Sequence, residues 1–363
     1  GEEVAASAGA ACHAEDVEVS HVLAAMGVDT PTALSTVRFS VGRFTSEAEV
    51  EHGADRILEV VNEIGGTVAQ HPVPSPLEVR LTRYTHGLGC ACKLEPRLLD
   101  DLLSGLVPSG RPEVLVGPET GDDACAWLLE NGTVLVATTD FFTPVVDEPR
   151  RFGAIAAANA LSDVYAMGAR PLFALDIAAF PTAALPVAVM AEVLAGALEV
   201  AEEAGIPILG GHTIEATEPM FGWVVIGRTT EDRLWRNSGA RPGDVLVLTK
   251  PLGTGIWATA AKHGIADPAG WEVAQATMRR LNAAAARVLG GYGPRAVTDV
   301  TGFGLLGHLR EMLVASEVDA ELWAEAVPML AGSEALVVRG EVPGGTQANL
   351  ASAARWTEWD PAV

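Results

Sequence analysis

Residues 133–140 read TVLVATTD, and residues 152–168 read FGAIAAANALSDVYAMG. The first stretch is apolar and β-branched, so it predicts a strand over 133–138 that ends close to Asp140. The second stretch is dominated by alanine, which favours helix, and it stops at Gly168, a residue type that often closes helices. We therefore expect a buried strand followed by a buried helix, the unit from which layered folds of helices and strands are built.

The same alternation of short apolar runs and helical patterns continues on both sides of this unit. Further strands are expected at residues 172–178, 206–209, 223–226, 245–248 and 296–298, and further helices at residues 97–106, 186–204, 271–289 and 305–315. This order predicts the α+β class, as a sandwich of helices against a sheet. A chain of 363 residues is long enough for two or three domains with real cores.

Changes in composition divide the chain into four segments. Residues 1–68 form a small unit with α and β patterns of its own. Residues 69–94 begin as a proline-rich linker and continue into a glycine-rich arm. Residues 95–238 are expected to form the larger domain, and residues 239–363 a second one, because the sequence SGARPG at 238–243 is typical of a boundary.

Charge and cysteine content exclude several classes of function. The chain carries 24 Lys and Arg against 47 Asp and Glu, a formal net charge of −23, so it repels nucleic acid and anionic membranes. No run of about 18 uncharged apolar residues is present to span a membrane. The 4 cysteines are too few for a disulfide framework, which favours reduced thiols and a cytoplasmic protein. We expect no nucleic-acid and no membrane partner.

Residues 86–93, HGLGCACK, combine two thiols with preceding glycines and a following lysine. Glycine reaches backbone conformations closed to other residues, so the stretch is typical of a mobile arm. Lys93 can bind phosphate and favour the thiolate of Cys90, which indicates chemistry that joins a chalcogen to a phosphoryl group. The alternative interpretation is a glycine-rich turn with two incidental cysteines.

Several aspartates stand where a divalent cation could be held. Asp122 and Asp123 follow a Thr-Gly pair, and Asp140 ends the first strand. Asp163 lies in the alanine-rich helix, one turn from Asn159, and Asp299 precedes a glycine-rich stretch that is expected to start a helix. Mg²⁺ prefers hard oxygen ligands, often one or two carboxylates together with substrate phosphates. Each of these aspartates taken alone could equally be a cap or a turn residue.

The sequence GGHT at residues 210–213 directly follows the expected strand at 206–209. A strand that runs into a glycine pair can cradle a phosphate or a nucleotide in its turn. The same glycines could simply turn the chain, and His212 could be a core histidine with its hydrogen bonds satisfied.

In this order, the motifs resemble those of the selenophosphate synthetase family. The resemblance rests on the arm at 86–93, TGDDA at 120–124, TTDFFTP at 138–144, NALSD at 159–163, GGHT at 210–213, TDVTGFG at 298–304 and VPGGT at 342–346. It runs from about residue 79 to the end of the chain. It implies a two-domain fold like that of aminoimidazole ribonucleotide synthetase. It also implies a homodimer, in which the arm reaches the neighbouring subunit's nucleotide.

The resemblance also implies an activity and a set of site residues. The family makes selenophosphate, AMP and phosphate from selenide, ATP and water, with Mg²⁺. By position, Cys90 is similar to the catalytic cysteine and Lys93 to the essential lysine. The implied metal ligands are Asp123, Asp163 and Asp299. The implied ATP contacts are Thr120, Gly121, Asp122, Asp140, Asp163, Gly211, His212 and Thr213.

The chain departs from the family pattern in two places. Leu88 and Ala91 stand where smaller residues are usual, and the arm is expected to be slightly stiffer for it. The family continues well past residue 346 with further second-domain sequence, so we expect a truncated second domain here.

Residues 1–68 resemble a different family, the C-terminal end of NifS/IscS-type cysteine desulfurases. The resemblance rests on SAGAAC at 7–12, SHVL at 20–23 and VRFSVGRFT at 37–45. It implies a segment of a small α/β domain from a pyridoxal-phosphate transferase, with Cys12 as the persulfide-forming cysteine and the pyridoxal-phosphate lysine upstream. A fusion of this kind could hand selenium from Cys12 to Cys90.

Two further functions stay open at this point. One is another ATP-dependent enzyme of the same superfamily that acts on a different small substrate. The other is a non-catalytic selenium or sulfur relay protein, in which Cys12 and Cys90 carry the chalcogen and no ATP is hydrolysed.

Overall fold

A computed structural model describes residues 79–85, 87–89, 110–118 and 121–359. These residues belong to one compact unit, Val73–Val363. The expected segment at 1–68 with Cys12, the expected helix at 97–106 and most of the glycine-rich arm lie outside the described residues.

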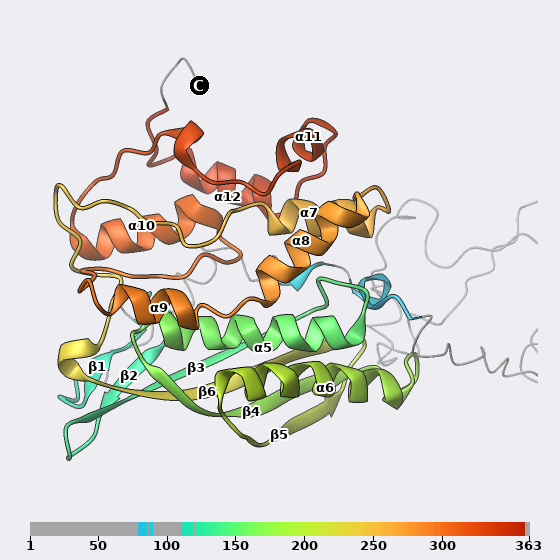
Figure 1. Cartoon of the computed structure of the whole chain (residues 1–363), viewed down its shortest axis with the longest axis horizontal. Helices are drawn as coiled ribbons and strands as arrows, with labels where there is room; N and C mark the ends of the chain where they lie inside the picture. Colours follow the sequence, from blue (N-terminus) through green and yellow to red (C-terminus); the bar gives the residue numbers. More distant parts are fainter. Residues whose placement is uncertain (1–78, 86, 90–109, 119–120, 360–363) are drawn as a thin grey trace, which may run out of the picture. The chain divides into compact units, whose positions relative to one another are not determined.

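The first half of the described chain builds a six-stranded mixed sheet with the order β1-β2-β3-β6-β4-β5 (Figure 1). Its strands are β1 (Val114–Val116), β2 (Cys125–Leu128), β3 (Thr133–Phe142), β4 (Arg170–Phe180), β5 (Ile208–Glu215) and β6 (Met220–Thr230). Only β4 and β5 pair in parallel among these strands. The long β3 and β6 pair over ten residues each and form the centre of the sheet. The predicted strands at 133–138, 172–178 and 223–226 are confirmed, each as part of a longer one.

Helices α5 (Pro149–Ala166) and α6 (Val187–Ala204) cover one face of this sheet (Figure 1). Alternate residues of β3, from Val134 to Phe142, are buried toward α5, which is itself buried along almost its whole length. The two helices cross closely, because a Cβ atom on Gly196 would lie 1.8 Å from the backbone oxygen of Arg150. The predicted helix over 152–167 is confirmed, and it begins earlier because Pro149 fits the first helical turn.

The prediction for residues 206–213 is wrong in two respects. The expected buried strand is the exposed edge strand β5, and the expected glycine turn at 210–211 lies inside it. Gly211 pairs with Asp176 of β4, and a Cβ atom at Gly211 would lie 2.2 Å from the backbone oxygen of Asp176. The second glycine therefore permits close approach of two strands, which is the other recognised use of glycine inside a strand.

The second half of the described chain is helical. It contains α7 (Thr254–Lys262), α8 (Pro268–Arg279), α9 (Ala283–Leu289), α10 (Gly304–Ser316), α11 (Ser333–Val338) and α12 (Gly345–Ala353). Short 3-10 turns lie at η1 (Leu81–Tyr84), η3 (Glu231–Arg233) and η4 (Ala324–Ala326). Residues 257, 260, 274, 330 and 336 form a small core of their own.

Two expected strands and one expected helix in this half are corrected. Residues 245–248 and 296–298 are not strands, because neither stretch joins a ladder in the described chain. The N–H of Val297 donates to the backbone oxygen of Arg236 at 3.0 Å, and this single bond makes no strand pair. Val245 and Val247 are accordingly 84% and 71% exposed. The expected helix at 271–289 is two helices, since Arg280 adopts an extended conformation that ends α8.

Within the described ranges, no helix combines the length and the apolar character that crossing a membrane requires.

Candidate functional site

Asp140 and Asp163 meet where α5 packs on β3. Both side chains are buried, and each is held by a partner from the opposite element. The Thr138 hydroxyl of β3 donates to Oδ2 of Asp163 at 2.6 Å, and the Asn159 amide of α5 donates to Oδ2 of Asp140. Asn159 and Asp163 share one face of the helix, as their spacing of four residues predicts. The strand and the helix therefore present two carboxylates together.

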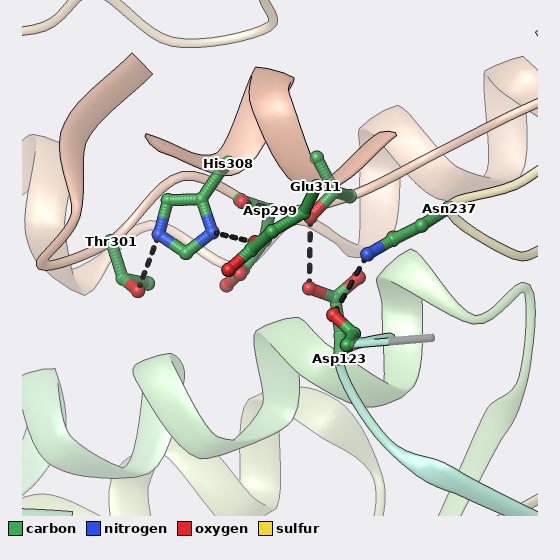
Figure 2. A network of polar contacts seen from close by, with 8 residues as sticks. Asp123, Asn237, Asp299, Thr301, His308 and Glu311 are labelled. Carbon is green, nitrogen blue, oxygen red and sulfur yellow. Dashed lines mark hydrogen bonds and ion pairs between the residues drawn. The ribbon is translucent and has the colours of Figure 1, made fainter. Parts of the chain in front are cut away.

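The loop before β2 carries Asp122 and Asp123, and the charge of Asp123 acts on Asp163. Figure 2 shows Asp123 near Asn237 and Asp299. The Thr298 hydroxyl donates to Oδ1 of Asp123 at 2.9 Å, which joins this loop to the segment that carries Asp299. Asn237 fixes the loop from another side. Its backbone N–H donates to Oδ1 of Asp122 at 2.5 Å, and its side-chain amide donates to the backbone oxygen of Gly121 at 2.8 Å.

These carboxylates repel one another. The pKa of Asp163 is raised well above its ordinary value by burial first, and then by the charges of Asp299, Asp140 and Asp123. Burial and the charges of Asp299 and Asp122 likewise raise the pKa of Asp123, against hydrogen bonds from Thr298 and from backbone. Such a cluster is costly to keep ionised without a counter-charge. A bound cation would supply that charge.

The donor set fits a hard divalent cation that arrives with its own oxygen ligands. Oδ2 of Asp123 is buried and has no hydrogen-bond partner among the described residues. Yet no three Asp, Glu, His or Cys side chains of the described chain stand close enough together to hold a metal ion by themselves. Mg²⁺ characteristically binds one or two carboxylates and completes its shell with water and phosphate. These carboxylates would therefore supply only part of the shell of a metal ion, and the phosphates of a substrate would supply the rest.

Lys250 and Asn237 belong to the site, although the sequence analysis did not single them out. Lys250 donates to the backbone oxygen of Arg280 and lies close enough to Asp299 to interact with its charge. Burial, assisted by Arg280, lowers the pKa of Lys250 to about 8. The sequence around Lys250 gives little indication of a functional role, because a single lysine after an apolar run is common. Asn237 is fully buried, and only its position at the expected domain boundary could have drawn attention to it.

His308 supports the turn after Asp299 (Figure 2). Its imidazole is buried, with Nε2 lying 3.2 Å from the Thr301 hydroxyl and Nδ1 lying 3.1 Å from the Glu311 carboxylate. These contacts fasten the residues after Asp299 to α10, so the loop that carries the aspartate is anchored at both ends.

The base of the glycine-rich arm lies just beyond the end of β3. The N–H of Gly89 donates to the backbone oxygen of Thr143 at 3.1 Å, and the Thr143 hydroxyl donates to the backbone oxygen of Gly87 at 3.3 Å. The φ of Gly89 is +54°, and a Cβ there would lie 2.2 Å from Cγ1 of Val145, so this position requires glycine. The described base of the arm therefore contacts Thr143, which lies three residues past Asp140 and directly after β3. Cys90, Lys93 and Thr120 lie outside the described residues.

Gly211, His212 and Thr213 are not adjacent to the aspartates. Gly211 shares a cross-strand row with Asp140, but β6 and β4 stand between them. Three strand spacings amount to about 14 Å. All three residues are exposed on the edge strand, so within one chain the structure does not join them to the carboxylate cluster.

Comparison with known proteins gives two levels of similarity. Residues 121–229 match the family model described as "AIR synthase related protein, N-terminal domain", and residues 241–345 match the corresponding C-terminal domain. A curated selenide, water dikinase from Myxococcus xanthus (strain DK1622) is 52% identical over 274 residues, covering 75% of this chain and 78% of the relative. The enzyme of that name from Escherichia coli (strain K12) is 46% identical over 275 residues, 76% of this chain and 79% of the relative.

Solved structures of the same fold are more distant in sequence. AaThiL complexed with AMPPCP and TMP aligns with a TM-score of 0.55 at 20% identity, covering 69% of this chain and 79% of its own. A HypE–HypF complex aligns with a TM-score of 0.53 at 18% identity, covering 68% and 79%. These matches confirm the predicted two-domain fold of the aminoimidazole ribonucleotide synthetase type, with a mixed sheet.

Proposed function

The chain belongs to the selenide, water dikinase family, and we propose that it synthesises selenophosphate from selenide and ATP, with release of AMP and phosphate. The observation that carries the proposal is the carboxylate cluster of Asp123, Asp163 and Asp299. It draws ligands from a loop, a helix and a segment more than a hundred residues away. Phosphoryl transfer needs charge neutralisation and positioning more than covalent protein chemistry, and such a cluster supplies both through metal ions.

In this proposal Asp123, Asp163 and Asp299 would hold Mg²⁺ together with the phosphates of ATP. The bound metal would supply charge neutralisation at those phosphates. The raised pKa values of Asp123 and Asp163 and the orphaned oxygen of Asp123 support this assignment, because each describes negative charge that lacks a partner. Lys250 would add positive charge at the edge of the same site.

The nucleotide is proposed to contact the loop at residues 120–122, together with Asp140 and Asp163. Gly121 has a φ of +62° and open space around its Cα atom, so a ligand can approach its backbone closely. Asn237 keeps this loop in place through its bonds to Gly121 and Asp122. Gly211, His212 and Thr213 are also proposed to contact ATP. Because two strands separate them from Asp140, this contact requires that another chain segment brings ATP to the edge strand.

Cys90 is proposed to handle selenide and Lys93 to bind phosphate. The anchored base of the arm supports this, because Gly87 and Gly89 are fastened to Thr143 just beyond the strand that carries Asp140. An arm that starts there can bring a thiolate and an ammonium group toward the carboxylate cluster.

We also propose that the chain acts as a homodimer. The sheet face opposite α5 and α6 carries Trp127, Phe141 and Ile214, which are 37%, 47% and 56% exposed. No described helix covers this face. Exposed apolar patches of this kind mark interaction surfaces, and a second copy of the same face is a suitable partner.

The segment around Cys12 is proposed to come from a cysteine desulfurase and to deliver selenium to Cys90. If so, fused and separated halves should differ in selenophosphate yield when a selenide trap is present. Equal yields would argue against a direct handover.

The proposed activity is tested by measuring AMP formation with and without selenide, for the full chain and for Cys90→Ser. We expect AMP to form only with selenide and Mg²⁺, and to fall at least a hundredfold in Cys90→Ser. Persulfide or selenide loading without ATP hydrolysis would instead identify a relay protein. ATP hydrolysis that ignores selenide would identify another enzyme of the superfamily.

A further inference from the structure

A hollow of about 530 Å³ lies at the end of the sheet opposite the carboxylate cluster. It is lined by Thr133, Gly168, Arg170, Arg228, Thr229, Thr230, Asp232 and Arg233. Thr133 begins β3 and Asp140 lies seven residues further along it, so the two sites are about 24 Å apart. None of the lining residues belongs to the proposed catalytic site. Arg228 pairs with Leu135, which pairs with Trp127, so the arginines share the sheet face that is proposed above to form the homodimer. Access to the hollow therefore requires that the dimer leaves this end of the sheet open.

Two arginines are placed directly opposite each other in this hollow. Arg170 begins β4 and is the Cα partner of Arg228 near the end of β6. Directly paired residues of neighbouring strands project from the same face, and like charges in that position are destabilising. Neither guanidinium forms an ion pair or a hydrogen bond with another described residue. In a chain with a net charge of −23, this local excess of positive charge is unusual.

The remaining residues of the hollow complete a site for an anion. Thr133 is the direct cross-strand partner of Thr230, and the Thr133 hydroxyl can donate a hydrogen bond to an anion, whereas the Thr230 hydroxyl is used by Asp232. Arg233 contributes a third guanidinium from the 3-10 turn η3. Asp232 opposes it in charge, and a hydrogen bond from the side chain of Thr230 holds the pKa of this carboxyl below its ordinary value. The three arginines and the one aspartate that line the hollow therefore leave a net charge of two positive units.

We propose that this hollow binds a small molecule carrying a phosphate or diphosphate group, at a site separate from the ATP site. Guanidinium groups bind phosphate oxygens in a bidentate manner, and an anion between Arg170 and Arg228 would remove their repulsion. The hollow is open to solvent and has room for more than one phosphate group. The ligand class we propose is therefore a phosphorylated small molecule rather than a bare ion.

The test uses inorganic pyrophosphate as the probe, titrated calorimetrically into the full chain in the presence of EDTA. Without Mg²⁺ the carboxylate cluster repels the probe, so the arginine hollow should bind about one pyrophosphate per chain more tightly than the proposed site at Lys93 does. We expect Arg228→Gln to weaken this tighter binding at least tenfold and Arg170→Gln/Arg228→Gln to abolish it. Asp232→Asn should tighten binding about threefold, because it removes the one opposing charge.

Arg339→Gln serves as the matched control, since Arg339 is an exposed arginine at the end of α11, in the helical second half of the described chain. Equal weakening in Arg339→Gln, or no metal-free binding at all, would overturn the proposal. Dissociation of a dimer in Arg228→Gln, measured by sedimentation, would show instead that the arginines pair with carboxylates of a second copy, which also overturns it. Selenide-dependent AMP formation should be unchanged in Arg228→Gln, so this test and that of the proposed function fail independently.

Discussion

The close crossing of α5 and α6 makes a sharp prediction for Gly196→Ala. The added Cβ would lie 1.8 Å from the backbone oxygen of Arg150 and 3.1 Å from the backbone nitrogen of Ala154. Backbone atoms in the middle of a helix cannot rotate away, so the two helices must separate by more than about 1 Å to restore ordinary contact. Without this clash the substitution would stabilise α6 by about 1 kcal/mol, because alanine favours helix over glycine.

The magnitude follows from the balance of these two effects. Overpacking a core typically costs about 1–3 kcal/mol, and separation also weakens the contacts along the whole α5–α6 crossing. We expect a net loss of about 2–4 kcal/mol in the free energy of unfolding, measured by urea denaturation with far-UV circular dichroism. Because α5 also carries Asn159 and Asp163, the KM for ATP should rise as well.

Two further variants control this experiment. Gly344→Ala changes a glycine with helical φ and ψ and open space around it, and should leave stability within about 0.5 kcal/mol of the wild type. Gly153 faces Val193 at the same crossing, so Gly153→Ala/Gly196→Ala should lose less than the sum of the single losses. Wild-type stability in Gly196→Ala would refute the packing derived for this crossing.

Three other predictions concern the charges of the site. In Asp163→Asn, removal of a buried charge should raise the Tm of the metal-free protein by about 3 °C, measured by calorimetry. The same variant should show no further rise in Tm when Mg²⁺ and ATP are added together. Because the folded pKa of Asp163 is raised, wild-type stability falls as pH rises above 3.8 toward that pKa, and the variant should show a flatter profile; identical profiles would contradict the assignment. Burial lowers the pKa of Lys250 in the folded protein from 10.5 to about 8. Between these two pH values the unfolded chain binds more protons than the folded one, so the free energy of unfolding should rise by about 1–2 kcal/mol as the pH increases from about 8 to 10.5. Lys250→Met should lose that rise in urea titrations repeated at each pH. Thr298→Val leaves a second oxygen of Asp123 without its partner and should cost about 1–3 kcal/mol in urea denaturation; a loss below about 0.3 kcal/mol would mean that the hydrogen bond is not formed.

The local patterns that predicted the fold correctly are those in which the composition of a segment agrees with its burial. Residues 133–138 and 152–167 obey both local propensity and burial, and the strand and helix that they form are present. The spacing of Asn159 and Asp163 also placed two site residues on one helix face. These features can be predicted from the sequence because they depend only on residues within one helical turn or one strand.

The predictions that were wrong concern segments whose structure depends on contacts with residues far away in the sequence. Residues 245–248 have strand composition, but a strand exists only where another pairs with it, and no described segment does. The glycines at 210–211 lie in a strand because the edge of β4 holds them there. The hydrogen bond from Thr298 to Asp123 spans 175 residues, and no local pattern contains it.

The central claim is that this chain joins selenium to a phosphoryl group of ATP. The most direct measurement is ³¹P nuclear magnetic resonance of a reaction containing the full chain, Mg²⁺, ATP and selenide labelled with ⁷⁷Se. The account predicts a new phosphorus signal split by the selenium nucleus, with AMP and phosphate appearing alongside it. Consumption of ATP without a selenium-coupled phosphorus signal, or no consumption at all under these conditions, would contradict it.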